Sequence, residues 1–204
     1  TEENADFHQI VADMANIPRK QAKTINLGLS YGMGKEKLIK ELGLDNTEAE
    51  NLFQQYHAKV PFIRALQDQC ARVAMERGYI KTFKGRRCRF NLWESRYERT
   101  LPLPLKEAKE KYGDDLKRSY TYKALNRLIQ GSAADMTKLA MIGLWEEGII
   151  PHLQVHDEVD ISIENIEQAN KVIQIMENCV ELDVPLLVDQ ELGASWGETK
   201  EIKT

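Results

Sequence analysis

The sequence predicts an α+β fold, with a helical first part followed by a smaller part built around an antiparallel hairpin. Up to about residue 77, apolar residues recur at spacings of three and four, which is typical of amphipathic helices. Two period-2 strand patterns then meet at His156-Asp157-Glu158, within residues 153–163. We therefore expect a helical subdomain over residues 1–118, and a second subdomain with an antiparallel sheet and covering helices over residues 119–204.

The composition fits an ordinary globular chain. Its 204 residues suffice for one domain or for two subdomains that share a core, and no apolar run has membrane-spanning length. Cys70, Cys88 and Cys179 lie far apart without metal-site spacing, which indicates reduced thiols in a cytoplasm-like compartment. The start of the sequence has no signal-peptide pattern. Because the chain opens at Thr1 rather than at Met, we expect a fragment or a processed product.

The net charge of −4 is distributed unevenly. Basic residues dominate between Arg77 and Arg99, whereas acidic residues dominate from Glu146 to the end of the sequence. This asymmetry is compatible with a polyanion that lies across the middle of the chain. Two solvated faces of opposite sign would give the same pattern, so charge alone leaves both interpretations open.

Two helices are expected near the start, over residues 7–16 and from Pro18 to about Met33. On a helical wheel the second helix has a buried stripe and, opposite it, a stripe that repeats every four residues. The buried stripe is Ala22, Ile25, Leu29 and Met33, and the opposite stripe is Arg19, Lys23, Leu27 and Tyr31.

The opposite stripe has an unusual charge order. Arg19, Lys20 and Lys23 add positive charge at a helix N-terminus, where the dipole already supplies roughly half a positive charge. A bound polyphosphate would make this arrangement favourable, and Leu27 and Tyr31 would offer flat surface to a sugar and a base. A solvated cationic face is the alternative, but it does not explain the Arg-Lys-Leu-Tyr order.

The middle of the chain is expected to be scaffold. Residues 35–42 should form a helix, Thr47–Glu50 a capping box that opens the next helix, and Pro61 the start of a helix that ends near Gly78. Residues 78–87 predict two strands joined by a Lys-Gly turn. Residues 91–118, which are charged and contain two prolines, predict an exposed excursion, and residues 120–147 predict a long helix.

The tip of the later hairpin carries an imidazole and two adjacent carboxylates, a combination that would suit a cation. A polar turn is the alternative, because Asp and Glu are common in turns for conformational reasons. Asp160 and Trp196 are expected to be structural. A helix near residues 165–182 and a strand near residues 185–192 should complete this part.

The stripe on the second helix resembles a known motif. Arg19-xxx-Lys23-xxx-Leu27-xxx-Tyr31-Gly32 resembles the fingers-helix motif of the family A DNA polymerases, the DNA polymerase I family. The resemblance implies that Arg19 and Lys23 grip the triphosphate of the incoming nucleotide. It further implies that Leu27 packs on the nucleotide sugar and that Tyr31 stacks near the templating pair.

Two features accompany this motif. The family usually has Phe or Tyr where this chain has Leu27, a departure that bears on sugar packing and on discrimination against dideoxy analogues. Asp6-Phe-His8 resembles the upstream D-x-H element of the family, whose His approaches phosphate. His8 is thus expected to bind nucleotide, and Gly32 to lie beside DNA.

Two later stretches resemble DNA-contacting elements of the same family. Residues 78–87 resemble G-Y-x-x-T-x-x-G-R-R, which implies that Arg86 and Arg87 contact DNA phosphates. Residues 126–135 resemble N-x-x-x-Q-G-(T/S)-A-A-D, which implies that Asn126 and Gln130 reach the minor groove near the primer terminus.

Leu153-Gln-Val-His-Asp-Glu158 resembles the palm motif that carries the second catalytic carboxylate. The resemblance implies that Asp157 binds metal, with Glu158 beside it. It also implies that His156 lies near the primer 3′ end and that Gln154 faces the duplex.

The resemblance covers nearly all of residues 5–198 and implies a fingers subdomain plus the C-terminal part of a palm. Such polymerases use two Mg²⁺ ions, and the first catalytic Asp belongs to a D-Y-S-x-I-E-like segment expected several tens of residues before Arg19. Because that segment and a thumb are absent from the sequence, half of the two-ion site is expected here, and the chain is expected to be inactive alone.

The expected function is template-directed DNA synthesis, the transfer of a nucleotide from a dNTP to a primer 3′-OH. Expected partners are primer-template DNA, dNTPs and an N-terminal polymerase portion, on the same chain or on a partner chain of a split enzyme, but no membrane. The short connection between His8 and Arg19 favours a phage-like replication polymerase in the host cytoplasm. A non-catalytic nucleotide- or DNA-binding module is the main alternative, and a metal-dependent phosphohydrolase using Asp157 and Glu158 is another.

Overall fold

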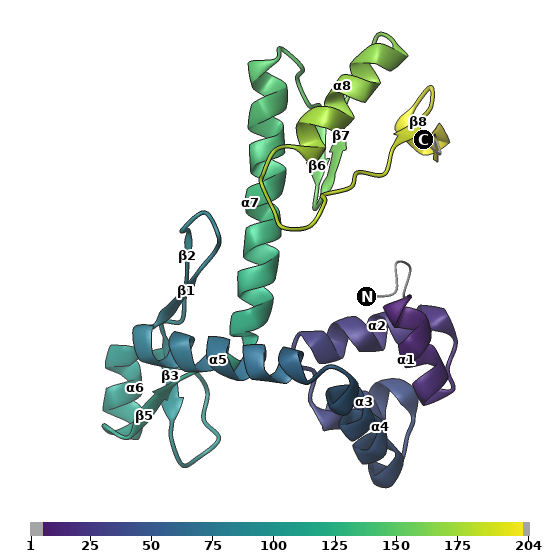
Figure 1. Ribbon diagram of the computed structural model, residues 1–204. Helices are drawn as coiled ribbons and strands as arrows, with labels where there is room; N and C mark the ends of the chain where they lie inside the picture. The colour runs from purple at the N-terminus through teal and green to yellow at the C-terminus, as the bar shows by residue number, and fades with distance from the viewer. Residues whose placement is uncertain (1–5, 202–204) are drawn as a thin grey trace. The chain divides into compact units, whose positions relative to one another are not determined.

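The computed structural model describes residues 6–201, without the side chains of residues 7, 14, 15 and 201. The described residues form two compact units (Figure 1). The first contains the residues up to Lys81 together with Gly85–Ile129, and the second contains Thr82–Lys84 together with the residues from Gln130 onward. The functional boundary predicted after residue 118 stays a prediction. No described helix is both long enough and apolar enough to cross a membrane.

The first unit opens with a run of helices: α1 (Phe7–Ala15), α2 (Arg19–Ser30), α3 (Lys35–Leu42), α4 (Asn46–Lys59) and α5 (Pro61–Arg77). Asp6 caps α1 by accepting hydrogen bonds from backbone N–H groups of its first turn. The capping box of α4 consists of Asp45 and Glu48, two residues earlier than the predicted Thr47–Glu50. The prediction was wrong because Asp45, like Thr47, is a good cap and the chain uses the earlier one.

The helices α1–α4 share a hydrophobic core at the N-terminal end of α5 (Figure 1). The predicted buried stripe of α2 is confirmed, since Ala22, Ile25 and Leu29 are at most 1% exposed. The helix ends at Ser30, earlier than predicted, and Met33 packs on the core from beyond it. One face of α2 is therefore fixed in the core and the other is available to ligands.

A second core cluster lies further along the first unit. It joins α5 to a hairpin of β1 (Tyr79–Lys81) and β2 (Arg87–Arg89) and to the start of α7 (Ala124–Glu146). In the hairpin, Ile80 pairs with Cys88, and both pack on this cluster. Because side chains alternate along a strand, the neighbouring residues of both strands face away from the cluster.

Residues 91–118, predicted to be an exposed excursion, are mostly exposed but contain regular secondary structure. They form the antiparallel sheet β4-β3-β5, from β3 (Leu92–Ser95), β4 (Leu103–Pro104) and β5 (Leu116–Arg118), with α6 (Leu105–Tyr112) against it. Arg118 ties this sheet to its surroundings. Its guanidinium donates to the carbonyls of Met75 and Phe90 and lies 4.3 Å from the centre of the Trp93 ring.

Gly78 ends α5 at a φ of +77°, and a Cβ at this position would lie 2.7 Å from Cζ of Arg118. Gly78→Ala is expected to lower the free energy of unfolding by about 2–3 kcal/mol. Positive φ accounts for about 1 kcal/mol of this loss, and displacement of Arg118 from its carbonyl partners accounts for the rest.

Gly85→Ala is the matched control, because Gly85 has a φ of +84° but no atom within 4 Å of its Cβ position. Denaturant unfolding of both variants should show the larger loss for Gly78→Ala. Equal losses would mean that the contact with Arg118 adds nothing to stability.

The 3₁₀ turn η1 (Thr121–Lys123) leads from the first unit into α7, whose later turns belong to the second unit. That unit also contains β6 (Leu153–Val155), β7 (Glu158–Asp160), α8 (Ile166–Glu177), β8 (Glu191–Leu192), η2 (Trp196–Glu198) and β9 (Lys200–Glu201). The strand predicted over residues 185–192 was wrong for most of its length, since only the last two residues pair, and they pair with β9. The sheets of the described residues are small and antiparallel, which confirms the α+β class.

Helix α8 packs closely on α7. A Cβ at Gly143 of α7 would lie 2.9 Å from Cγ2 of Ile175 of α8, and Lys171 Nζ donates to Glu147 Oε2 at 2.5 Å. In contrast, β6 and β7 pair only with each other among the described residues. Large apolar side chains of this unit are also exposed, notably Trp145 (65%) and Leu187 (78%).

Candidate functional site

The N-terminal half of α2 presents a cationic face. Arg19 and Lys23 are exposed, and Leu27 has 43% of its surface accessible. The helix begins after Pro18 without a side-chain cap, and its first turn contains no acidic residue. The helix dipole and the two cations therefore act in the same direction, which favours an anion at this end.

Asp6 joins two of the predicted nucleotide-binding residues. Its Oδ1 accepts from the backbone N–H of His8, and its Oδ2 accepts from Arg19 Nε at 2.6 Å. The hydrogen bond from Arg19, followed by the backbone N–H of Gln9, holds the pKa of Asp6 below its usual value. Because the ion pair engages Nε, the terminal amino groups of Arg19 are the donors that a phosphate would meet.

Because the pKa of Asp6 is lowered in the folded state, the free energy of unfolding should depend on pH through this group. A carboxyl group whose pKa is lower in the folded state contributes stability above the unfolded pKa and loses it as the pH falls through the folded pKa. Asn caps helices as well as Asp does, so Asp6→Asn removes the charge while keeping the cap. Urea unfolding below pH ~4 should therefore lose stability more steeply in the wild type than in Asp6→Asn. Parallel pH curves would show that the ion pair with Arg19 does not stabilise the fold.

The end of α2 is fixed by α5. Gln67 Nε2 donates to the carbonyl oxygens of Leu29 and Ser30, at 2.9 Å each. Tyr31 follows, half-buried, and Gly32 turns the chain at a φ of +87°, a conformation that suits glycine. The structure thus brings His8, Arg19, Lys23, Leu27, Tyr31 and Gly32 onto or beside one helix.

The hairpin β1–β2 has a cationic outer face. Lys81 pairs with Arg87 and Tyr79 pairs with Arg89, so these four side chains lie on the face opposite the core. The guanidinium of Arg87 lies 4.8 Å from the centre of the Tyr79 ring. Arg86 is exposed in the connecting loop. Such a face can hold phosphates without reading bases.

Helix α7 carries both predicted minor-groove residues. Asn126 is half-buried and Gln130 is exposed, and a spacing of four residues puts them one turn apart on one face. The intervening Arg127 donates to Arg89 O at 2.8 Å, which ties the start of α7 to the hairpin.

The remaining predicted residues lie at the turn between β6 and β7. Val155 pairs with Glu158, which leaves His156 and Asp157 as a two-residue turn, and His156 has a φ of +56°. The side chains of His156, Asp157 and Glu158 are exposed. Gln154 is also exposed, and its Nε2 donates to the carbonyl of His156.

The carboxylates of this hairpin fit Mg²⁺ in type, because Mg²⁺ prefers hard oxygen ligands. Asp160 lies on the same strand face as Glu158, and its Oδ2 is buried without a hydrogen-bond partner among the described residues. However, no group of three or more metal-ligating side chains occurs in the part of the chain that the structure describes. The carboxylates of the hairpin can therefore serve as ligands of an ion, although they do not form a complete ligand set among the described residues.

Three residues near the predicted sites have surroundings that the sequence did not predict. Trp196, expected to pack, is 62% exposed and donates from Nε1 to Glu158 Oε1 at 3.3 Å. Asp160, expected to be structural, carries the unpartnered oxygen. Asn26 is 4% exposed and contacts His8. Only Asn26 had a signal in the sequence, a polar side chain at the buried side of an amphipathic helix.

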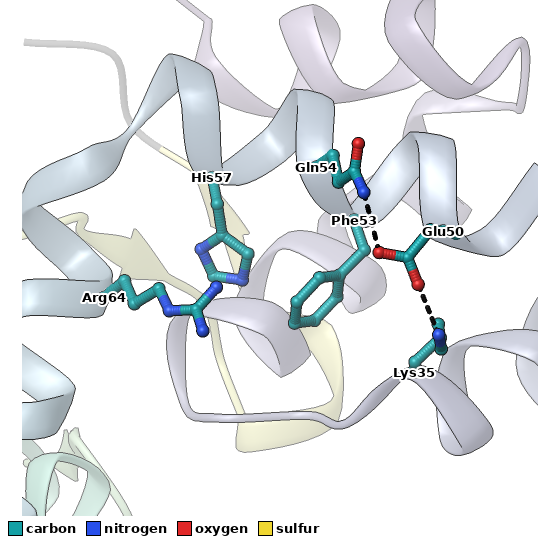
Figure 2. Close-up of a pocket in the computed structure, with 6 residues that line it drawn as sticks. All are labelled: Lys35, Glu50, Phe53, Gln54, His57 and Arg64. Carbon is teal, nitrogen blue, oxygen red and sulfur yellow. Dashed lines mark hydrogen bonds and ion pairs between the residues drawn. The ribbon is translucent and has the colours of Figure 1, made fainter.

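A cavity of about 360 Å³ lies between α3, α4 and α5 (Figure 2). It is lined by Lys35, Glu50, Phe53, Gln54, His57 and Arg64. Glu50 accepts from Lys35 and Gln54, while burial and, secondarily, the charge of Arg64 lower the pKa of His57. None of the predicted site residues lines this cavity, so we do not assign them to it.

Comparison with known proteins gives consistent matches. The model of the family described as DNA polymerase family A matches residues 2–198. The DNA-directed DNA polymerase of Pseudomonas phage M6 is 37% identical over 230 residues, covering 96% of this chain and 32% of that protein. The thermostable DNA polymerase I of Thermus filiformis is 34% identical over 190 residues, covering 90% of this chain and 21% of that protein.

Among solved structures, the POL domain of Pol1 from M. smegmatis, in complex with DNA primer-template and dNTP, matches with a TM-score of 0.67 and 29% identity. The match covers 89% of this chain and 32% of that one. This chain therefore spans about a third or less of the length of these relatives.

Proposed function

Because this chain belongs to DNA polymerase family A, we propose that it carries out template-directed DNA synthesis as the C-terminal part of such a polymerase. The observation that carries the proposal is the cationic face of α2. There Arg19 and Lys23 stand on an uncapped helix N-terminus, and Asp6 holds Arg19 next to the start of α1, where His8 lies.

In this proposal the first unit receives the nucleotide. Arg19, Lys23 and His8 bind its triphosphate, where cations and N–H donors offset the phosphate charge. Leu27 packs on the sugar, and its exposure allows that contact. Tyr31 and Gly32 lie beside the templating base. The structure described with DNA primer-template and dNTP among the relatives supports these ligand classes.

The DNA would contact six further residues. Arg86 and Arg87 hold backbone phosphates, which positions the duplex without sequence preference. Asn126 and Gln130 donate to minor-groove acceptors, which are similar on every correct pair and so suit a polymerase. Gln154 and His156 face the primer end, beside the carboxylates.

Asp157 would hold Mg²⁺, with Glu158 beside it. When bound, two such ions activate the primer 3′-hydroxyl and stabilise the leaving phosphates. The other ligands, including the first catalytic Asp, would come with the thumb from the remainder of a longer polymerase or from a partner chain. This part of the proposal is supported by the exposed apolar side chains of the second unit and by the edges of β6–β7, which pair with no further strand among the described residues. The phage polymerase among the relatives supports a host cytoplasm as the place of the reaction.

The test is primer extension with Mg²⁺ and four dNTPs. The chain would be assayed alone and as a chimera, in which it replaces the segment of the Pseudomonas phage M6 polymerase that it matches. Extension by the chimera only is expected. A folded chimera that binds primer-template without extending it would favour a non-catalytic binding module. Phosphate release from dNTPs without primer or template would favour a phosphohydrolase.

A further inference from the structure

A chain of buried and half-buried polar side chains runs beneath the cationic face of α2. Tyr56 of α4 is 1% exposed, and its hydroxyl donates to Asn26 Oδ1 at 3.0 Å. Asn26 Nδ2 lies 2.9 Å from Nδ1 of His8 in α1. Ser30 Oγ lies 2.9 Å from the Tyr56 hydroxyl. These four residues connect α1, α2 and α4 through side chains alone.

The directions of these hydrogen bonds place a proton on His8. Because Tyr56 donates to the carbonyl oxygen of Asn26, the amino group of Asn26 is the part that faces His8. An amide NH₂ group can only donate, so Nδ1 of His8 must accept. A neutral imidazole with an accepting Nδ1 carries its proton on Nε2.

Because Asn26 is buried, loss of its hydrogen bonds to His8 and Tyr56 would destabilise the fold. Asn26 occupies the inward side of α2 between Ile25 and Leu29, where its neighbours are apolar. A buried polar side chain is stable there only when its groups are hydrogen-bonded, because an unpaired group would lose its hydrogen bonds to water without replacement. Both ends of the Asn26 amide have partners, His8 and Tyr56, so the amide is held in one orientation.

We propose that Asn26 is a positioning residue, which fixes His8 as the Nε2–H tautomer and so presents one N–H donor to a phosphate of the incoming nucleotide. The Asn26–His8 contact stands on geometry alone, whereas the role of the donor rests on the proposed function. Asn26 contacts no phosphate itself. It acts through His8, and Tyr56 acts one step further back by orienting Asn26.

The tautomer can be measured without any activity assay. In the chain labelled with ¹⁵N-histidine, long-range ¹H–¹⁵N spectra distinguish a proton on Nδ1 from one on Nε2, and His8→Gln identifies the His8 signals. The wild type should show the Nε2–H form. Asn26→Asp should move the proton to Nδ1, because a carboxylate only accepts. Ser30→Ala, which removes a hydroxyl of the same network without touching His8, should change nothing.

A proton on Nδ1 in the wild type would overturn the inference outright, since the amide would then have the opposite orientation. An unchanged His8 spectrum in a folded Asn26→Asp variant would overturn it too.

A double-mutant cycle tests whether Asn26 acts through His8. Inorganic triphosphate would be titrated into the wild type, Asn26→Leu, His8→Ala and the double variant, with circular dichroism to establish folding. Asn26→Leu and His8→Ala should each weaken binding by roughly 10-fold to 100-fold, the value of one hydrogen bond to a charged group. In the His8→Ala background, Asn26→Leu should have no further effect.

Equal effects of Asn26→Leu in both backgrounds would refute a positioning role. If the wild type binds no triphosphate, the proposed function fails at this site, and the tautomer measurement still decides whether Asn26 sets the His8 proton.

Discussion

Replacing Asp157 with Ala is expected to lower the rate of primer extension by the phage chimera about a thousandfold or more. Asp157 lies in the two-residue turn between β6 and β7, exposed to solvent, where its carboxylate can reach an ion. Bound metal supplies several kcal/mol of transition-state stabilisation, and each 1.36 kcal/mol corresponds to about tenfold in rate. Single-turnover extension at saturating dNTP would measure the change.

Asp183→Ala is the control for this experiment. Asp183 is an exposed carboxylate of the same unit with no proposed role, so its loss should leave the rate unchanged. The Asp157→Ala chimera should also retain its affinity for primer-template, because base pairs and phosphates are bound elsewhere. Extension by the Asp157→Ala chimera at near wild-type rate would show that another carboxylate holds the ion.

Replacing Lys23 with Ala is expected to raise the KM for dNTP by about 10-fold to 100-fold. A charged hydrogen bond to phosphate is worth about 1.5–3 kcal/mol, and Lys23 stands one turn beyond Arg19 on the exposed face of α2. Steady-state extension with one dNTP varied would measure this effect.

Lys20→Ala is the matched variant. Lys20 is also exposed near the start of α2, but it does not belong to the stripe of Arg19, Lys23, Leu27 and Tyr31. It should change KM about twofold at most, through the general field of the helix terminus. Equal effects of the two substitutions would mean that α2 attracts the nucleotide by net charge rather than through a positioned lysine.

The helices were predictable from the sequence because local patterns decide them. Ala22, Ile25 and Leu29 repeat at helical spacing and are buried as predicted. Pro61 and Gly78 bound α5 as predicted, by the usual preferences for Pro at the first turn and Gly just after the last.

Structure that depends on distant partners was harder to predict. The short strands within residues 91–118 were not predicted, because most of the surrounding residues are polar. Arg118 organises that segment through carbonyls of Met75 and Phe90, which no local pattern indicates. Likewise, residues 185–188 are all apolar, but residues 185–190 have no partner strand among the described residues, so the predicted strand shortens to Glu191–Leu192.

The candidate site likewise contains residues that the sequence predicted and contacts that it did not. Motif spacing identified Arg19, Lys23 and Asp157, and the structure finds their side chains exposed. Motif spacing did not identify the contacts that hold the site residues, such as Asn26 with His8 or Trp196 with Glu158. These contacts arise from packing between elements far apart in sequence. The roles of the motif residues stay predictions until substitutions are measured.

The most direct test of template-directed synthesis is single-nucleotide incorporation by the chimera. Each of the four dNTPs would be offered separately against each of the four template bases, with Mg²⁺ and a defined primer. The complementary dNTP should be added at least about a hundredfold faster than the others, since mismatched pairs lose the shared minor-groove acceptors that Asn126 and Gln130 would contact. Addition that does not depend on the template base, or none by a folded chimera with bound primer-template, would contradict the proposed function.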